Sequence, residues 1–243
     1  MTENASRRRF LQAGLTLIPV VGLASQGLSV EAATPTSSNN NDHQAPTRSD
    51  QAYRPRFFST EEWAFLCAAT EQLIPADGLG PGANDCGIPE FIDRQMDTRY
   101  GHGGLWYMQG PFITDQAPEL GYQQKHTPRD IYRFGIKGCD DWCKKTYSRT
   151  FSQLSASEQV AVLRKLEAGE VPIAELKSTL FFAYLLKNSK EGYFADPIYG
   201  GNRNMTGWKM IGFPGARADY MDWIDHPNQR YPLGPVSVNG ERG

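Results

Sequence analysis

The sequence lacks the short motifs by which many enzymes hold a redox cofactor or activate a nucleophile. It contains no Cys-x-x-Cys-His and no Cys-x-x-Cys cluster, so covalent c-type haem and iron–sulfur clusters are not expected. It also contains no Gly-x-Gly-x-x-Gly, Gly-x-Ser-x-Gly or His-Glu-x-x-His, which are typical of dinucleotide-binding folds, hydrolases and zinc proteases. We therefore expect neither a cofactor-binding site nor a catalytic site in this chain.

The chain also has no large excess of positive or negative charge. The chain has 25 basic and 27 acidic residues, which gives a net charge of −2. Proteins that bind nucleic acids concentrate positive charge in a patch or stripe. The near balance predicts that nucleic acid is not a partner.

Histidine is scarce, and this limits the ligands available to a metal ion. The chain has 4 histidines, of which His102, His126 and His226 follow residue 52, all in segments that we predict to be loops. Three histidines are a common ligand set of catalytic zinc. A stand-alone metal-dependent enzyme that uses these three residues is therefore one alternative interpretation.

Cysteine is also limited, to Cys67, Cys86, Cys139 and Cys143. The last two are four residues apart in a predicted helix, where their Cβ atoms are farther apart than the roughly 3.8 Å of a disulfide. We do not expect them to bond to each other, although each can pair elsewhere, including with another chain. A disulfide that involves Cys86, in a loop rich in glycine and proline, is one expectation; free buried thiols are the other.

The amino terminus carries the most informative motif of the chain. Residues 6–12 read Ser-Arg-Arg-Arg-Phe-Leu-Gln and precede an uncharged apolar stretch, so Arg7, Arg8, Phe10 and Leu11 indicate a twin-arginine export signal. This route carries folded proteins to the periplasm, and often proteins that receive a cofactor in the cytoplasm. Glycine and proline weaken the stretch as a helix, which favours a signal peptide. Val30-Glu31-Ala32 offers small residues at the positions that a signal peptidase reads, which predicts cleavage after Ala32. Retention as an uncleaved anchor is the alternative.

The chain divides into three predicted parts. Residues 1–32 form the signal, and residues 33–52 form a polar linker that cannot bury enough apolar area to offset its ordering entropy. Residues 53–243 are long enough for one domain with a substantial core. No stretch of this domain alternates convincingly with a period of two, so the expected fold class is all-α, a single helical domain with long loops rich in glycine, proline and aromatic residues.

Helix signals recur along this domain. Ser59 and Glu62 form a capping box, as do Ser155 and Glu158, and both predict the start of a helix. The expected helices run from Ser59 to Pro75, from Pro89 to about Tyr100, from Thr127 to about Thr150, from Ser155 to Ala168 and onward from Pro172, with a short turn at 219–224. Ile131, Phe134, Trp142 and Tyr147 are the expected apolar anchors of the third helix.

Two loops are unusually aromatic. Residues 101–127 include Trp106 and Tyr107, and a binding module for carbohydrate that uses this pair is a further alternative interpretation. Residues 191–215 combine glycines with aromatic residues of the types that anchor interfaces, which favours a rigid loop that faces a protein partner over one that packs on its own domain. The candidate interface residues are Tyr199, Gly200, Gly201, Asn202, Arg203, Asn204, Trp208 and Phe213.

The second loop also carries a resemblance to a known family. The run through Gly201-Asn202-Arg203-Asn204, Gly207-Trp208 and Gly212-Phe213-Pro214-Gly215 resembles the gluconate 2-dehydrogenase subunit 3 family. The resemblance extends to Leu73-Ile74-Pro75-Ala76-Asp77, to Phe91-Ile92-Asp93 and to the twin-arginine leader. The segment from Cys139 to Cys143 has no clear counterpart in that family.

The resemblance implies a function for a chain without cofactor motifs. Members are small subunits of periplasm-facing dehydrogenases of sugars and sugar acids, in which a large subunit holds FAD and a multihaem cytochrome c subunit passes electrons to membrane quinone. The small subunit has no redox centre, stabilises the large subunit and supplies its export signal to the translocase. A disulfide between one of the cysteines and the large subunit is left open.

Overall fold

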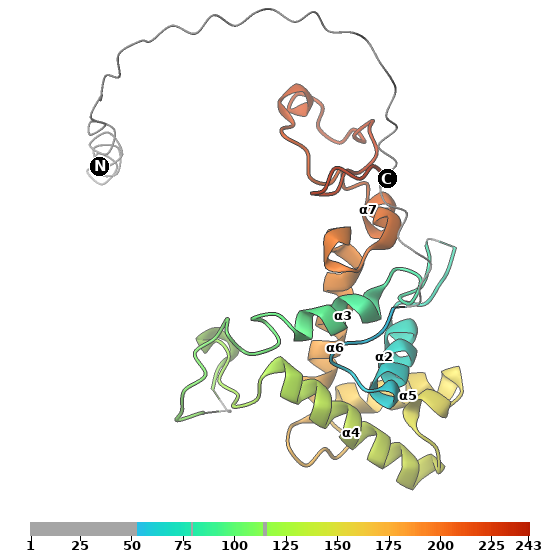
Figure 1. Ribbon diagram of the computed structural model, residues 1–243, viewed down its shortest axis with the longest axis vertical. Coiled ribbons are helices and arrows are strands. Elements are labelled where there is room, and N and C mark those ends of the chain that lie inside the picture. Colours follow the sequence, from blue (N-terminus) through green and yellow to red (C-terminus); the bar gives the residue numbers. More distant parts are fainter. Residues whose placement is uncertain (1–52, 79, 114–115) are drawn as a thin grey trace, which may run out of the picture. The chain divides into compact units, whose positions relative to one another are not determined.

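This computed structural model describes residues 53–78, 80–113 and 116–243. Within these residues the chain forms six α-helices and no strand (Figure 1). All of these residues belong to one unit that spans residues 51–243. The helices are α2 (Thr60–Leu73), α3 (Ile88–Met96), α4 (Pro128–Tyr147), α5 (Ala156–Ala168), α6 (Ser178–Phe194) and α7 (Thr206–Ile211). The all-α prediction is confirmed for these residues, while Arg7, Arg8, Phe10, Leu11 and the linker lie outside them.

Short 3₁₀ helices connect these elements. They lie at Pro118–Leu120, Phe151–Gln153, Pro197–Tyr199, Arg203–Met205 and Met221–Trp223. The turn predicted at 219–224 is the last of them. Within the described residues, no helix has both the length and the apolar character needed to span a bilayer.

Capping boxes determine where three of the helices begin. Ser59 accepts a hydrogen bond from the backbone of Glu62, whose side chain accepts one in return, and the same reciprocal pair begins α5 at Ser155 and Glu158. Thr127 and Asp130 begin α4 in this way. Each box satisfies backbone N–H groups that have no partner within the helix. The predicted helix starts at Ser59, Thr127 and Ser155 are confirmed.

The fifth predicted helix begins later than expected. Pro172 does not open it; α6 starts at Ser178, and residues 172–177 form an irregular segment. The side chain of Ile173 in this segment packs beside Gly138 of α4, where a Cβ atom would lie 2.8 Å from the Ile173 Cγ2 atom. Tertiary packing of the segment against α4 therefore overrides the helix-start preference of proline.

α6 is the central helix of the domain and packs against α2, α3, α4 and α5. Its buried residues face several directions and include Phe181, Leu185 and Tyr193, so it is covered on most sides rather than along one stripe. In α4 the predicted anchor Ile131 is fully buried, whereas the predicted anchors Phe134, Trp142 and Tyr147 are only partly buried. The fully buried aromatic residue of this helix is Tyr132. The Tyr132 ring lies edge-on to Phe181, 6.0 Å between centroids.

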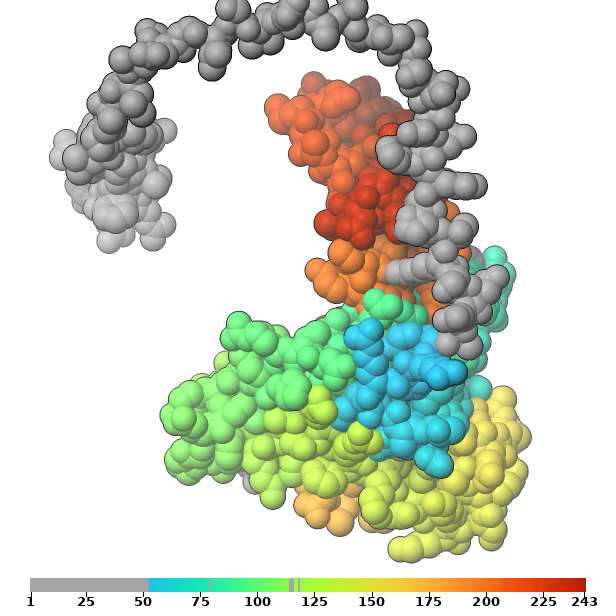
Figure 2. Space-filling view, viewed as in Figure 1, coloured from blue at the N-terminus to red at the C-terminus, as the bar shows by residue number. Residues whose placement is uncertain are grey.

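Residues 53–58 form a strap next to α4, in which Arg54 and Arg56 are exposed and Phe57 and Phe58 are buried (Figure 2). The strap is held by Asp93 of α3, a fully buried carboxylate. Its Oδ1 accepts hydrogen bonds from the backbone N–H groups of Phe57 and Phe58, at 3.0 and 3.1 Å. Its Oδ2 accepts from Tyr53 and from the Arg56 N–H, at 2.7 and 2.8 Å. A buried charge with four donors is fully satisfied, so Asp93 connects the start of the domain firmly to α3.

Candidate functional site

The loop that follows α6 is organised by Asn202. This residue is fully buried and adopts a left-handed backbone conformation, with φ of 45°. Its Nδ2 group donates to the Ala195 carbonyl oxygen at 2.9 Å, and its Oδ1 atom accepts from the Gly207 N–H at 2.8 Å. One side chain thus connects the end of α6 to the start of α7. Asn202 shapes the loop from inside and is not available to a partner.

Arg203 attaches the same loop to α3. Its Nη2 atom lies 2.5 Å from Oε2 of Glu90, a largely buried carboxylate that also forms an ion pair with Arg94. The Arg203 N–H donates to the Cys86 carbonyl oxygen at 3.1 Å. The buried carboxylate is paired with two guanidinium groups, so Arg203 connects the loop to α3.

Two glycines allow this close packing. A Cβ atom on Gly201 would lie 2.2 Å from the Gly192 carbonyl oxygen, and Gly200 has a φ of 99° that other residues avoid. Gly200 and Gly201 are buried, so they serve the backbone of the loop rather than a partner surface.

Trp208 also points inward. It is 5% exposed, and its Nε1–H donates to the Phe194 carbonyl oxygen at 2.7 Å. Phe213 packs edge-on to it, 5.1 Å between centroids, but is itself 44% exposed. Of the predicted interface residues, Tyr199, Asn204 and Phe213 are exposed, whereas the others are buried or, for Arg203, partly buried.

The exposed large apolar side chains of the domain are confined to two segments. All of those in the part of the chain that the structure describes lie between residues 105 and 120 or between 194 and 238. Such concentrated exposure is typical of an interaction surface. The first segment contributes Leu105, Tyr107, Phe112, Ile113 and Leu120. The second contributes Phe194, Ile198, Tyr199, Met210, Ile211, Phe213, Tyr220, Met221, Ile224, Leu233 and Val238.

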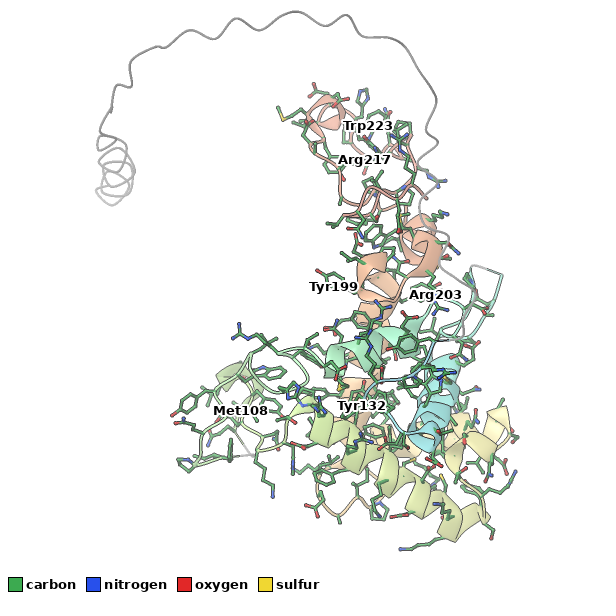
Figure 3. The ribbon with its side chains drawn as sticks, viewed as in Figure 1. Met108, Tyr132, Tyr199, Arg203, Arg217 and Trp223 are labelled. Carbon is green, nitrogen blue, oxygen red and sulfur yellow. The ribbon has the colours of Figure 1, made fainter. Side chains whose placement is uncertain are left out.

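The two segments meet at a cleft of about 660 Å³. Leu105 and Trp106 line it from the first segment, and Phe194 and Tyr199 line it from the second. Figure 3 shows Tyr199 projecting toward the side of the domain on which the loop with Met108 lies. Tyr100 lies beside Trp106, and its hydroxyl donates to Asn188 Oδ1 at 2.8 Å. Burial raises the pKa of this hydroxyl, so Tyr100 stays neutral.

The histidines predicted for the metal-site alternative are not brought together. His102 contacts Arg129, His126 bonds through Nε2 to the Glu175 carbonyl oxygen, and His226 lies against Trp223. No group of three His, Cys, Asp or Glu residues among those the structure describes is placed to hold a metal ion.

The aromatic pair of the carbohydrate-module alternative is separated in the same way. Trp106 packs between Tyr100 and Tyr122, with centroids at 5.5 and 5.1 Å, and lines the cleft. Tyr107 is 77% exposed and lies outside the cleft. The two rings do not form a common platform within the cleft.

All four cysteines are free thiols, so the expected disulfide through Cys86 is not formed. Cys86, Cys139 and Cys143 are buried, and only Cys67 is partly accessible. The pKa of the Cys139 thiol is raised, first by its hydrogen bond to the Cys143 side chain and then by burial. Burial raises the pKa of the Cys67 thiol to about 11, so this residue is a weak nucleophile at neutral pH.

Comparison with known protein families identifies most of the helical domain. The model of the family described as gluconate 2-dehydrogenase subunit 3 matches residues 60–215, from the first turn of α2 to the end of the loop that Asn202 and Trp208 organise. No curated protein and no solved structure shows a significant match. The matched range contains the whole cleft and excludes residues 216–243.

Proposed function

We propose that this chain, which belongs to the gluconate 2-dehydrogenase subunit 3 family, is the non-catalytic small subunit of a periplasm-facing, FAD-dependent gluconate 2-dehydrogenase-like complex. In this proposal the large subunit holds FAD and oxidises the sugar or sugar acid. A multihaem cytochrome c subunit carries the electrons to quinone and keeps the complex at the cytoplasmic membrane. The small subunit stabilises the large subunit and supplies its twin-arginine signal.

The family match over residues 60–215 is the observation that carries the proposal. The confinement of exposed large apolar side chains to two segments supports it, because a subunit that works inside a complex must keep a surface for its partner. The leader sequence around Arg7 and Arg8 supports the export role, since FAD is inserted in the cytoplasm and the loaded large subunit must cross the membrane folded.

Purification from the native host tests the subunit role. We expect the tagged full chain, extracted with detergent, to bring down a yellow flavoprotein and a multihaem cytochrome in stoichiometric amounts. Flavin absorbance, haem absorbance and dye-linked oxidation of gluconate and related sugars are the measurements. A chain that purifies alone, without flavin, would contradict the proposal.

Substitution of the arginine pair tests the export role separately. The double variant Arg7→Lys, Arg8→Lys should leave the flavoprotein in the cytoplasm, whereas Arg9→Lys, which changes the neighbouring arginine outside the pair, should not. The measurement is dye-linked dehydrogenase activity in periplasm-facing membrane and cytoplasmic fractions. Export of active flavoprotein with the double variant would refute the escort role and leave the subunit role intact.

A further inference from the structure

Part of each wall of the cleft where the two apolar segments meet is held in place by contacts within the domain. Trp106 is held between Tyr100 and Tyr122, and Tyr100 is in turn hydrogen-bonded to Asn188 of α6. On the opposite wall the Phe194 carbonyl oxygen accepts from Trp208. Side chains that are already ordered lose little conformational freedom when a partner arrives, so Trp106 and Tyr100 are preorganised for binding.

The charged side chains at the cleft already have partners within the domain. Lys187 and Glu191 lie 3.7 Å apart and neutralise each other. Asp196 accepts backbone hydrogen bonds from Ile198 and Val238, at 3.0 and 2.8 Å. Apart from the amide of Gln95, the remaining wall residues are aromatic and aliphatic, so the cleft complements an uncharged, mainly apolar group and not an anion or cation.

The exposed apolar area of the family-matched range, most of it outside the cleft itself, is as large as one side of a stable complex needs. Eleven large apolar residues in the family-matched range are between 37% and 77% exposed. With about 200 Å² for a whole large side chain, covering them would remove about 1,000 Å² from water. A standard interface needs about 800 Å² per partner. The set consists of the five residues from Leu105 to Leu120 and of Phe194, Ile198, Tyr199, Met210, Ile211 and Phe213.

We infer that this cleft, between Leu105–Trp106 and Phe194–Tyr199, is the docking site of the FAD-bearing large subunit, which inserts an apolar or aromatic side chain between the two segments. The inference rests on the proposed function, and it adds which face of this chain contacts the large subunit. A partner common to the family must dock on the part of the chain that the family shares. The cleft lies inside that part, whereas the other exposed apolar residues, from Tyr220 to Val238, lie outside it.

Charge insertion at the cleft tests the inference. Leu105→Glu and Tyr199→Glu each place a carboxylate on one wall; these side chains are 60% and 54% exposed, so folding should be retained. Met221→Glu is the matched control, because Met221 is 71% exposed and lies outside the cleft. Ala161→Glu, at an exposed position of α5, controls for the added charge alone. The readout is FAD recovered per tagged full chain from detergent-solubilised whole cells of the native host, with melting temperature as the folding check.

We expect each cleft variant to recover at least about tenfold less FAD than the wild type at an unchanged melting temperature. Both controls should match the wild type. Equal recovery by all variants, or a loss with Met221→Glu alone, would overturn the docking site while the proposed function stands. A wild-type homodimer that the cleft variants dissociate without loss of FAD would assign the cleft to a second copy and also overturn the inference. No FAD with the wild type would instead refute the proposed function.

Discussion

The helical core buries its large apolar side chains, whereas the segments 105–120 and 194–238 expose many of theirs. In α2, α4 and α5 such residues are buried or partly buried, and the exposed positions of these helices are polar, charged or small. In the segments 105–120 and 194–238, sixteen large apolar residues are exposed. The core helices therefore bury their apolar side chains within the domain, whereas the two segments leave apolar side chains available for contact with a partner.

The comparison also separates two roles within the loop after α6. Asn202 and Trp208 face inward and give the loop its shape, while Tyr199 and Phe213 face solvent. The inward residues determine the stability of the loop, and the outward ones should determine binding. Substitutions in the two groups should therefore change different measurements.

The largest expected effect is in the core. Phe65→Ala should lower the free energy of unfolding by about 3–5 kcal/mol, because it removes a fully buried ring that packs 4.5 Å from Phe151. Tyr107→Ala, at a 77% exposed position, is the matched aromatic control and should change stability by less than about 0.5 kcal/mol. Chemical denaturation of the purified full chain measures both, and similar losses for the two variants would break the comparison.

Next comes the inward face of the loop. Asn202→Ala should lower stability by about 2–4 kcal/mol, since it leaves the Gly207 N–H and the Ala195 carbonyl oxygen without their partner. Asn204→Ala is a close control, because Asn204 has a similar left-handed backbone, with φ of 57°, but an exposed side chain. Thermal unfolding of the two variants tests the difference. If both lost stability equally, the backbone conformation and not the hydrogen bonding of Asn202 would explain the effect.

A smaller effect is expected at a partly buried carboxylate of α4. Burial raises the pKa of Asp140, whose Oδ1 accepts from the Phe151 N–H at 2.9 Å. A raised pKa in the folded state means that ionisation of Asp140 opposes folding above its titration range. Asp140→Asn can keep the hydrogen bond without the charge, so it should increase stability at pH 7 by less than about 1 kcal/mol, after allowance for solvent screening.

This gain should depend on pH. As the pH falls, the wild-type carboxyl becomes protonated, and the difference should disappear below the ordinary aspartic acid pKa of 3.8. Unfolding curves at pH 7 and at acid pH measure this. An advantage of Asp140→Asn that grew toward acid pH would contradict the assignment.

The smallest effect on stability is expected on the exposed apolar segments. Leu105→Ser and Ile211→Ser change residues that are 60% and 57% exposed, so the isolated chain should unfold within about 0.5 kcal/mol of the wild type. Apparent aggregation at high concentration should decrease, because both variants remove apolar surface. Light scattering and thermal unfolding on the same samples check the two statements, and a large loss of stability would show that these residues serve the fold.

Much of the fold could be predicted because its signals are local. The pairs Ser59–Glu62, Thr127–Asp130 and Ser155–Glu158 satisfy helix-terminal groups within four residues of chain, and Gly169 follows α5 in a left-handed conformation. The start of α6 could not be predicted, because Ile173 packs against Gly138 of α4, which lies more than thirty residues earlier in the chain. α7 is only six residues long and has no side-chain cap, which explains why no local signal predicted it.

The candidate site was predictable in position but not in orientation. The aromatic and glycine content of residues 191–215 indicated a structured loop, yet nothing in the sequence distinguished the inward Trp208 from the outward Phe213. The roles of Glu90 and Asp93 were missed because their partners, Arg203 and residues 53–58, are distant in sequence. A pair of acidic residues in a helix otherwise rich in apolar positions was the one available signal.

The sequence by itself determined the helical class, the places where α2, α4 and α5 begin and the family to which the chain belongs, since these depend on periodicity, capping and motifs within short stretches. Only the tertiary structure decided which aromatic residues are buried, that the cysteines remain free and that Leu105 and Tyr199 line one cleft. These features arise from contacts between segments far apart in the chain. Such contacts depend on how the helices pack against one another and not on any local pattern.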